Sequence, residues 1–303
     1  MSDTPQCDVL VIGSLNADLV VRAPRFPQPG ETISGDDLQI IPGGKGANQA
    51  VAAARQGASV AMTGRVGRDG FGDFLLDNLK NNRVDISNIE RDDASSGTAI
   101  IIVDESGQNS IVLSPGANGK VGSQDVDSAP DAKILLLQFE IPMKTVLHAA
   151  MRYKAKGTTV ILNPAPARQI PDELLAAVDI LVPNESELAL LTNLQVTDIK
   201  SAEFAAHKIL KQGVKTVIVT MGSNGALIVT DTQVTHVDAF KVDVVDTTAA
   251  GDAFIGGFAS AVLRGLNLEN AVRYANACGA LAATKFGAQP SLPTKEEVER
   301  FIK

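Results

Sequence analysis

A carboxylate follows a run of very small residues near the C-terminal end of the chain. In segment 245–254, VDTTAAGDAF, the residues Ala249, Ala250 and Gly251 lead directly to Asp252, and a helical segment follows. Small residues let a ligand approach the backbone, and the first turn of a helix exposes unpaired N–H groups at the positive end of its dipole. The segment therefore predicts an anion-binding site with an acidic side chain beside it.

Asp252 taken alone would be an ordinary helix-stabilising residue, worth about 0.3–1 kcal/mol. Two further features favour a chemical role. Gly256 and Gly257 interrupt the following helix, and because glycine weakens a helix, they indicate close packing at that point. Asp246 lies just upstream. Two carboxylates that frame an anion site require cations to balance their charge.

Two other glycine-bearing segments match known nucleotide motifs poorly. In PGGKGANQA (42–50) Lys45 is followed by Gly46, where a P-loop requires Ser or Thr. The segment VIGSLNAD has one glycine, Gly13, where a dinucleotide fingerprint has three. Segment 42–50 is therefore a glycine-rich turn that opens a helix. Its free N–H groups and Lys45 could meet an oxygen-rich ligand, or the lysine could simply be solvated.

Alternating strands and helices must position these groups. The strands expected are continuous apolar segments, which is typical of strands covered on both faces; they are 7–13, 132–138, 158–164, 179–184 and 215–222. The helices expected at 47–56 and 201–213 are each followed by or end in glycine. The pattern predicts an α/β fold with a mostly parallel central sheet covered by helices on both faces.

Two segments depart from this alternation. Residues 17–42 are rich in Pro, Gly and Asp, and residues 96–114 predict a β-hairpin around ESGQ at 105–108. We expect them to form a small β lid on a single domain that spans residues 1–303; additional edge strands are the alternative.

Composition excludes several classes of protein. A diffuse net charge of −8 over 303 residues disfavours nucleic-acid and membrane partners, since both require a basic face. The polar segment 1–7 does not resemble a secretory signal, and no stretch reaches the 18–20 or so apolar residues of a membrane helix. Cys7 and Cys278 predict small core residues in a reducing compartment, and the three histidines lack metal-ligand spacing. We expect a cytoplasmic protein.

Five segments together resemble the ribokinase-like carbohydrate kinase family, from about Cys7 to the end of the chain. They are IGSLNAD (12–18), GGKGANQAVAAARQGA (43–58), LNPAPAR (162–168), PNESEL (183–188) and DTTAAGDAF (246–254). The resemblance implies ATP-dependent phosphorylation of the 5-hydroxyl of D-ribose, which yields D-ribose 5-phosphate and ADP. It also implies a homodimer formed through the β lid.

The resemblance further implies roles for individual residues. Asp252 would be the catalytic base, beside an anion hole at Ala249, Ala250 and Gly251. The sugar would contact Asn16, Asp18, Gly44, Lys45, Asn48, Glu140 and Asp252. The nucleotide would contact Asn184, Thr220, Gly222, Gly225, Gly251 and Asn276. Potassium would be held by Asp246, Thr248, Ala282, Lys285, Gly287 and Ser291, several of them through backbone carbonyls. Glu187 would organise Mg²⁺ through water, although it could equally cap its own helix. Many relatives have glycine at the position of Ala249.

Other functions stay open from the sequence. The same chemistry could act on 2-deoxyribose, fructose or a nucleoside, although a carboxylate paired to a missing hydroxyl would be left unsatisfied, so Asp18 favours ribose. A sugar-binding regulator that has lost catalysis is a second alternative, disfavoured by the intact segment around Asp252. A dehydrogenase is a third, disfavoured by the missing dinucleotide fingerprint.

Overall fold

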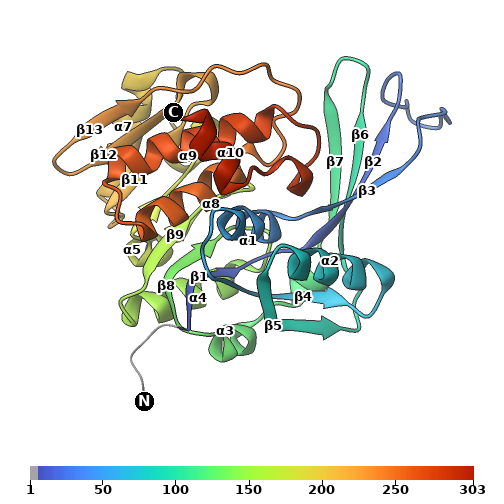
Figure 1. Ribbon diagram of the computed structural model, residues 1–303, viewed down its shortest axis with the longest axis horizontal. Helices are drawn as coiled ribbons and strands as arrows, with labels where there is room; N and C mark the ends of the chain where they lie inside the picture. Colours follow the sequence, from blue (N-terminus) through green and yellow to red (C-terminus); the bar gives the residue numbers. More distant parts are fainter. Residues whose placement is uncertain (1–5) are drawn as a thin grey trace.

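The computed structural model describes residues 6–303; residues 1–5, part of the polar segment without an expected signal, lie outside the described residues. A nine-stranded sheet runs through the molecule in the order β13-β12-β11-β10-β9-β8-β1-β4-β5 (Figure 1). Its strands are β1 (Cys7–Ile12), β4 (Val60–Gly67), β5 (Val84–Asp92), β8 (Ala132–Leu137), β9 (Thr159–Leu162), β10 (Ile180–Leu181), β11 (Thr216–Thr220), β12 (Ala226–Thr230) and β13 (Val234–Val237). Neighbouring strands from β5 to β11 are parallel, whereas β12 pairs antiparallel with both β11 and β13.

The central strand β1 shows why its sequence is apolar throughout. Val9 and Val11 belong to the hydrophobic cluster on one face of the sheet. Leu10 and Ile12 belong to the cluster on the other face. Successive side chains of a strand point to opposite faces, so a strand with helices on both sides is apolar at every position.

Helices cover both faces of this sheet. One face packs against α1 (Lys45–Arg55), α2 (Gly70–Asn81), α8 (Ala250–Leu263), α9 (Leu268–Ala283) and α10 (Lys295–Phe301). The other packs against α3 (Ser123–Ser128), α4 (Met143–Ala155), α5 (Asp172–Ala177), α6 (Glu185–Thr192) and α7 (Ile199–Leu210). Three short 3₁₀ helices are η1 (Gly116–Lys120), η2 (Gly222–Asn224) and η3 (Gln289–Ser291). The predicted fold class is confirmed. None of the helices within residues 6–303 is long and apolar enough to cross a membrane.

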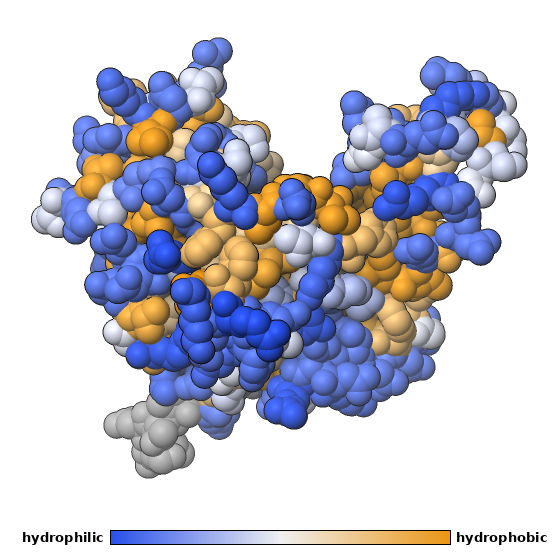
Figure 2. All heavy atoms as spheres, turned by 45° about the horizontal axis from the view of Figure 1, so that its top comes forward, coloured by the Kyte–Doolittle hydropathy of each residue, from blue (hydrophilic) through white to orange (hydrophobic). Residues whose placement is uncertain are grey.

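A second, four-stranded sheet rises from one end of the molecule (Figure 1). Its order is β3-β2-β6-β7, built from β2 (Asn16–Arg22), β3 (Gln39–Gly43), β6 (Gly97–Val103) and β7 (Asn109–Ser114). The hairpin expected around 105–108 joins β6 to β7, where Val103 pairs with Asn109. We call this second sheet the lid. Figure 2 shows the hollow that separates it from the helix-covered body.

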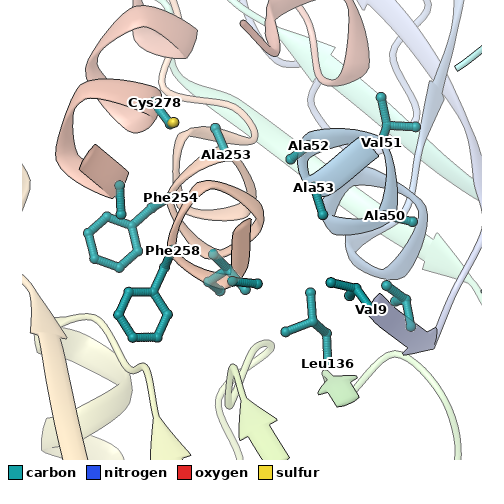
Figure 3. Close-up of a cluster of buried hydrophobic side chains, with 14 of the residues drawn as sticks. Val9, Ala50, Val51, Ala52, Ala53, Leu136, Ala253, Phe254, Phe258 and Cys278 are labelled. Atoms are coloured by element: carbon teal, nitrogen blue, oxygen red, sulfur yellow. The ribbon is translucent and has the colours of Figure 1, made fainter. Parts of the chain in front are cut away.

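Helices α1 and α8 lie side by side over β1 and β8 (Figure 3). The contact is close because Gly256 faces α1: a Cβ at this position would lie 2.4 Å from the Cβ of Ala52. The Ser260 hydroxyl also donates to the carbonyl of Ala53 at 3.2 Å. The close packing expected from the helix glycines is therefore confirmed, and it fixes the start of α8 against the start of α1.

Several predicted boundaries were wrong by one to three residues. The strand expected at 158–164 ends at Leu162, and the one expected at 179–184 comprises only Ile180–Leu181. Both end before an asparagine whose side chain serves the site described below. The helix expected at 201–213 begins at Ile199, because Asp198 caps it by accepting from the N–H of Ser201 at 2.8 Å.

Candidate active site

Polar residues follow the C-terminal ends of the parallel strands. Strand β1 pairs with β4 on one side and with β8 on the other, and the chain continues from it in both directions across the sheet. Such a point of reversal opens a crevice beyond the strand ends, which is the usual ligand site of an open α/β sheet. Ser14 follows β1, Glu140 follows β8 and Asn163 follows β9. These side chains therefore converge on one edge of the sheet.

The glycine-rich turn brings the start of α1 against the end of β1. Gly44 has φ +87°, a left-handed conformation that favours glycine, and it forms the N-cap of the helix. A Cβ on Gly46 would lie 2.5 Å from the backbone nitrogen of Ser14 and 2.8 Å from the Cα of Gly13. Because no side chain intervenes, α1 begins at Lys45 directly beside the end of β1.

Asp252 lies in the first turn of α8, and its side chain faces α1. Its Oδ2 accepts from Asn48 Nδ2 and its Oδ1 accepts from Gln49 Nε2, both at 3.0 Å. The residue is only 5% exposed. A buried carboxylate requires hydrogen-bond partners, and here both oxygens have one, with a second lone pair on each left for a ligand.

The start of α8 has the free N–H groups that the small residues predict, with one exception. Ala249 is the N-cap, at φ +59°, an unfavourable conformation for a residue with a Cβ. The N–H of Ala250 donates to the carbonyl of Thr247 at 3.2 Å. Within residues 6–303, the N–H groups of Gly251 and Asp252 donate to no backbone carbonyl. These two groups are available to an anion beside the Asp252 carboxylate.

Glu140 joins three of the site's elements through one oxygen. Its Oε2 accepts from the hydroxyl of Ser14, from the backbone N–H of Lys45 at 3.0 Å and from Asn16 Nδ2 at 3.4 Å. Asn118 in turn donates to Asn16 Oδ1 at 2.8 Å. The expected sugar-binding residues Asn16, Lys45 and Glu140 therefore lie together, held in one hydrogen-bonded set.

Asp18 is the unsatisfied member of this group. It is 8% exposed, and no hydrogen bond among residues 6–303 reaches its carboxylate. The carboxylate lies over Gly43, where a Cβ would meet Asp18 Oδ2 at 2.1 Å. Burial raises the pKa of Asp18 to about 7, and the negative charges of Glu140 and Asp252 add to the effect against the attraction of Lys45. A ligand with hydroxyl donors would satisfy this carboxylate.

A cavity of about 300 Å³ opens beside Asn16 and Glu140. Its wall also contains Leu113 from the lid, Phe139 and Pro166. A cavity with both polar and apolar lining residues suits a small polyhydroxylated molecule.

The site carries more negative than positive charge. Burial alone would lower the pKa of Lys45, but the attraction of Asp252, Glu140, Glu187 and Asp18 outweighs burial and raises it, so the lysine stays protonated. Four carboxylates thus surround one ammonium group. A phosphate-bearing ligand would add further negative charge, so the site requires a cation when it is filled.

The residues expected to bind nucleotide divide into two sets. Asn184, which follows β10, and Thr220, the last residue of β11, lie side by side and are linked by a β-bridge; Gly222 is exposed two residues further along the chain. Gly225 is buried at φ +85°. Asn276 donates its side-chain N–H groups to the carbonyls of Val237 and Asp238, at 3.1 and 3.0 Å. These two hydrogen bonds use both side-chain N–H groups of Asn276, which leaves only its Oδ1 for a ligand.

The position of Glu187 is compatible with both of its expected roles, capping its own helix and organising Mg²⁺ through water. Its Oε2 accepts from the N–H of Asn184 and its own N–H donates to Asn184 Oδ1, both at 2.8 Å, which forms a capping box at α6. Within residues 6–303, Oε1 takes part in no hydrogen bond. Burial raises the pKa of Glu187 above its usual range. One oxygen therefore caps the helix and the other is available to a cation or its water.

The segments expected to hold a monovalent cation meet at Asp246. Its Oδ1 accepts from the N–H and hydroxyl of Thr248 at 2.9 and 2.6 Å, and its Oδ2 accepts from the N–H of Gly287 at 2.9 Å. The backbone N–H of Asp246 donates to the carbonyl of Ala283, next to Ala282. Two other expected ligands use their side chains elsewhere: Lys285 pairs with Glu297, and Ser291 donates to Ala288. They could contribute only backbone carbonyls.

Five residues of the site were missed by the sequence interpretation: Ser14, Gln49, Asn118, Gln138 and Asn163. All five are buried. Four could have been found, because each is a polar residue at or next to the end of an apolar strand, or on the buried side of the glycine-rich turn. Asn118 had no such signal, since it lies in η1 and reaches Asn16 only through the fold.

Comparisons with known proteins identify the family of the chain and agree with its fold. The model of the pfkB family carbohydrate kinases matches residues 6–295. The chain belongs to the pfkB family of carbohydrate kinases. A ribokinase of Staphylococcus aureus (strain COL) is 41% identical over 299 residues, which are 96% of this chain and 98% of the relative. A deoxyribokinase of Salmonella typhi is 38% identical over 97% of this chain and 98% of its own.

A solved structure of another pfkB-family protein has the same architecture. Arabidopsis thaliana ribokinase, complexed with ribose and ATP, superposes with a TM-score of 0.92 at 35% identity, covering 98% of this chain and 99% of the other. The resemblance that the five sequence segments predicted is confirmed. The polar crevice at the point of reversal in the sheet thus lies in a carbohydrate kinase.

Proposed function

We propose that this protein transfers the γ-phosphoryl group of ATP to the 5-hydroxyl of D-ribose. The observation that carries the proposal is the position of Asp252, whose carboxylate is held by Asn48 and Gln49 and adjoins the free N–H groups at the start of α8. A proton acceptor and free backbone N–H groups thus lie at one point. The proposed sugar-binding residues Asn16 and Glu140 border a cavity of about 300 Å³.

The chemistry follows from this arrangement. As the bond between the sugar oxygen and the γ-phosphorus forms and the bond to the ADP oxygen breaks, the hydroxyl proton passes to the Asp252 carboxylate. Phosphoryl transfer has a loose transition state, so positioning and charge stabilisation do most of the work. The N–H groups of Gly251 and Asp252 are the groups of this chain placed to stabilise the transferred phosphoryl oxygens.

Cations complete the proposed site. ATP would bind together with Mg²⁺. Glu187, through its second carboxylate oxygen, and Asn184 would hold the ion through water. The ion would neutralise phosphate charge that Lys45 alone cannot balance. Potassium would lie near Asp246, whose Oδ2 accepts one hydrogen bond and has capacity for a ligand contact. The carbonyls of residues 282–291 would supply the remaining oxygens.

Ribose is favoured over 2-deoxyribose because no donor among residues 6–303 reaches the buried Asp18 carboxylate. The full set of ribose hydroxyls supplies more donors to the polar wall than 2-deoxyribose does, and a buried acceptor left without a partner costs about 1–3 kcal/mol. The 38% identity to a deoxyribokinase keeps 2-deoxyribose as the second candidate. A regulator without catalysis is not favoured, because Asp252 and the free N–H groups beside it are intact.

The lid supports the proposal of a homodimer. Ile40, Leu19, Ile100 and Val112 form one row across its four strands. Ile40, Ile100 and Val112 are 47%, 49% and 64% exposed, whereas Ile41, Asp18 and Ala99 of the neighbouring row are buried. An exposed apolar row at an open edge strand fits a second copy of the same surface. We place such a dimer in the cytoplasm, where sugar and ATP are both present.

The test is the variant Asp252→Asn, assayed by ADP release over pentoses, hexoses and nucleosides. The change removes the proton acceptor, so kcat should fall by a factor on the order of 10²–10⁴. Sugar and ATP should still bind near the parental affinity, because Asn48 can turn its otherwise unpartnered Oδ1 toward the new amide. A variant that melts lower yet turns over at nearly the parental rate would show Asp252 to be a helix cap.

A further inference from the structure

A line of buried amide side chains extends from Asp252 into the protein. Gln49 lies in α1, Gln138 follows β8 and Asn163 follows β9. Their exposed fractions are 0%, 1% and 9%. Four polar side chains, including Asp252, thus meet where α1, α8 and the two strand ends come together.

The carboxylate determines the direction of every hydrogen bond in this line. Because an ionised carboxylate only accepts, Gln49 must present Nε2 to Asp252, at 3.0 Å. Its second N–H then donates to Asn163 Oδ1 at 3.3 Å, and its Oε1 accepts from Gln138 Nε2 at 2.6 Å. Asn163 donates onward to the carbonyl of Val182 at 3.1 Å. Both N–H groups of the Gln49 amide therefore donate, and its oxygen accepts one hydrogen bond.

This arrangement suits a base better than it suits a core. An apolar residue would fill the space at position 49 without the desolvation of a buried amide. The amide instead holds one carboxylate oxygen while Asn48 holds the other. Both donors are neutral, so they fix the plane of the carboxylate and leave it able to accept a proton, which a paired ammonium or guanidinium group would oppose.

We propose that Gln49 is the residue that positions Asp252 for proton transfer, and that Gln138 and Asn163 act through Gln49. The proposal rests on the proposed role of Asp252 as the base. Gln49 would contact neither sugar nor nucleotide. Its effect would be on the geometry of the transferred proton, to which rates are sensitive because a misplacement of about 1 Å can cost about 10²-fold.

The decisive variant is Gln49→Met, which keeps the volume of the side chain and removes its hydrogen bonds. We expect kcat to fall by about 10- to 100-fold, while the KM for ribose changes by less than about threefold. The acid limb of kcat against pH should also move to higher pH, since a carboxylate that has lost a donor holds a proton more tightly. Lys45, Asp18 and Glu187, the charged groups that act on this carboxylate, are unchanged in the variant.

The matched control is Gln56→Met in the same helix. Gln56 is also buried, and its amide donates to the carbonyl of Pro293 and accepts from Tyr274, so its loss removes a comparable network away from Asp252. It should lower the melting temperature without changing kcat or its pH profile. A Gln49→Met protein that loses stability as the control does, with kcat within twofold of the parent, overturns the positioning role.

A second variant, Gln138→Glu, tests the line if Gln49→Met fails to fold. The new carboxylate only accepts, so it would draw the N–H group of Gln49 toward itself and turn Oε1 toward Asp252. We expect the Gln138→Glu enzyme to have a lower kcat than the parent although Gln138 does not contact Asp252. An unchanged kcat would count against the proposal. The proposed base is judged separately: an active Asp252→Asn enzyme refutes the base, whereas an inactive one with a normal Gln49→Met enzyme refutes only the positioning.

Discussion

The carboxylate of Asp246 binds the N–H of Gly287 at 2.9 Å and so joins two loops that lie 41 residues apart in the chain. One loop leads into the start of α8, the proposed anion site, and the other follows α9. Burial alone would raise the pKa of this carboxylate, but the hydrogen bonds from Thr248 and Gly287 together outweigh burial and hold the pKa below its usual range, so the group is charged at neutral pH. A cation bound here would therefore tighten both loops around the start of α8.

This junction predicts a response to potassium. Adding K⁺ to enzyme assayed in Na⁺ or Tris should raise kcat/KM, and Asp246→Ala should abolish the increase because the charged ligand is gone. The control is Asp243→Ala, an exposed aspartate in the same loop, which should keep the response. A parental rate that is indifferent to K⁺ from zero to physiological concentration refutes the proposed site.

The contact between α1 and α8 predicts a linked loss of stability and rate in Gly256→Ala. The added Cβ would lie 2.4 Å from Ala52 Cβ and 2.6 Å from the nitrogen of Ala53, so the helices must separate. Overpacking of this kind lowers the free energy of unfolding by about 1–3 kcal/mol, measured by urea denaturation. Because α8 carries Asp252 and α1 carries Gln49, kcat should fall as well.

The control for that experiment is Gly70→Ala at the start of α2. A Cβ on Gly70 would meet nothing within 4 Å. Its free energy of unfolding should change by less than about 1 kcal/mol, the difference in helix propensity. Equal stability of the two variants would show that α8 can move away from α1 without cost.

The sequence predicted those parts of the molecule that depend on local pattern. The apolar strands, the glycine-rich turn before Lys45 and the small residues before Asp252 each require particular residue types at particular spacing. Gln49 and Asp252, which share a hydrogen bond, are 203 residues apart in the sequence, so no local sequence pattern could predict that bond. The ends of the short strands were also unpredictable, because Asn163 leaves its strand in order to reach α1, a tertiary contact that overrides strand propensity.

The lid predicts a dimer of twice the 31.7 kDa of one chain. Val112 is 64% exposed on edge strand β7, so Val112→Asp would place a charge in the proposed interface and should shift the mass found by light scattering toward that of a monomer. The control Phe204→Asp changes an apolar residue that is 69% exposed on α7, away from the lid, and should not alter the mass. A parental protein that is monomeric and fully active at working concentration would exclude the dimer.

Asp18 predicts opposite effects on stability and on sugar binding. Its pKa of about 7 in the folded protein lies above the value of about 3.9 expected in the unfolded chain. The folded state therefore holds this proton more tightly, and the stability that the group contributes is full below about pH 4 and is lost as the pH rises through 7. Asp18→Asn removes that loss. Without sugar, the free energy of unfolding of the variant should therefore exceed that of the parent by about 1–3 kcal/mol between pH 5 and pH 8. The control Asp37→Asn, at an exposed position in the loop between β2 and β3, should show no such change.

Sugar binding should follow the ionised form of the same carboxylate. An ionised carboxylate accepts from two hydroxyls, whereas a protonated one has lost part of that capacity. The dissociation constant of ribose, measured by calorimetry, should therefore rise as the pH falls below about 7 in the parent and stay flat in Asp18→Asn. The variant Asp18→Ala should raise the ribose KM and narrow the preference for ribose over 2-deoxyribose, since both sugars then lack the same partner. An unchanged ratio of the two kcat/KM values would remove Asp18 from sugar recognition, and the raised pKa would then reflect burial of the carboxylate alone.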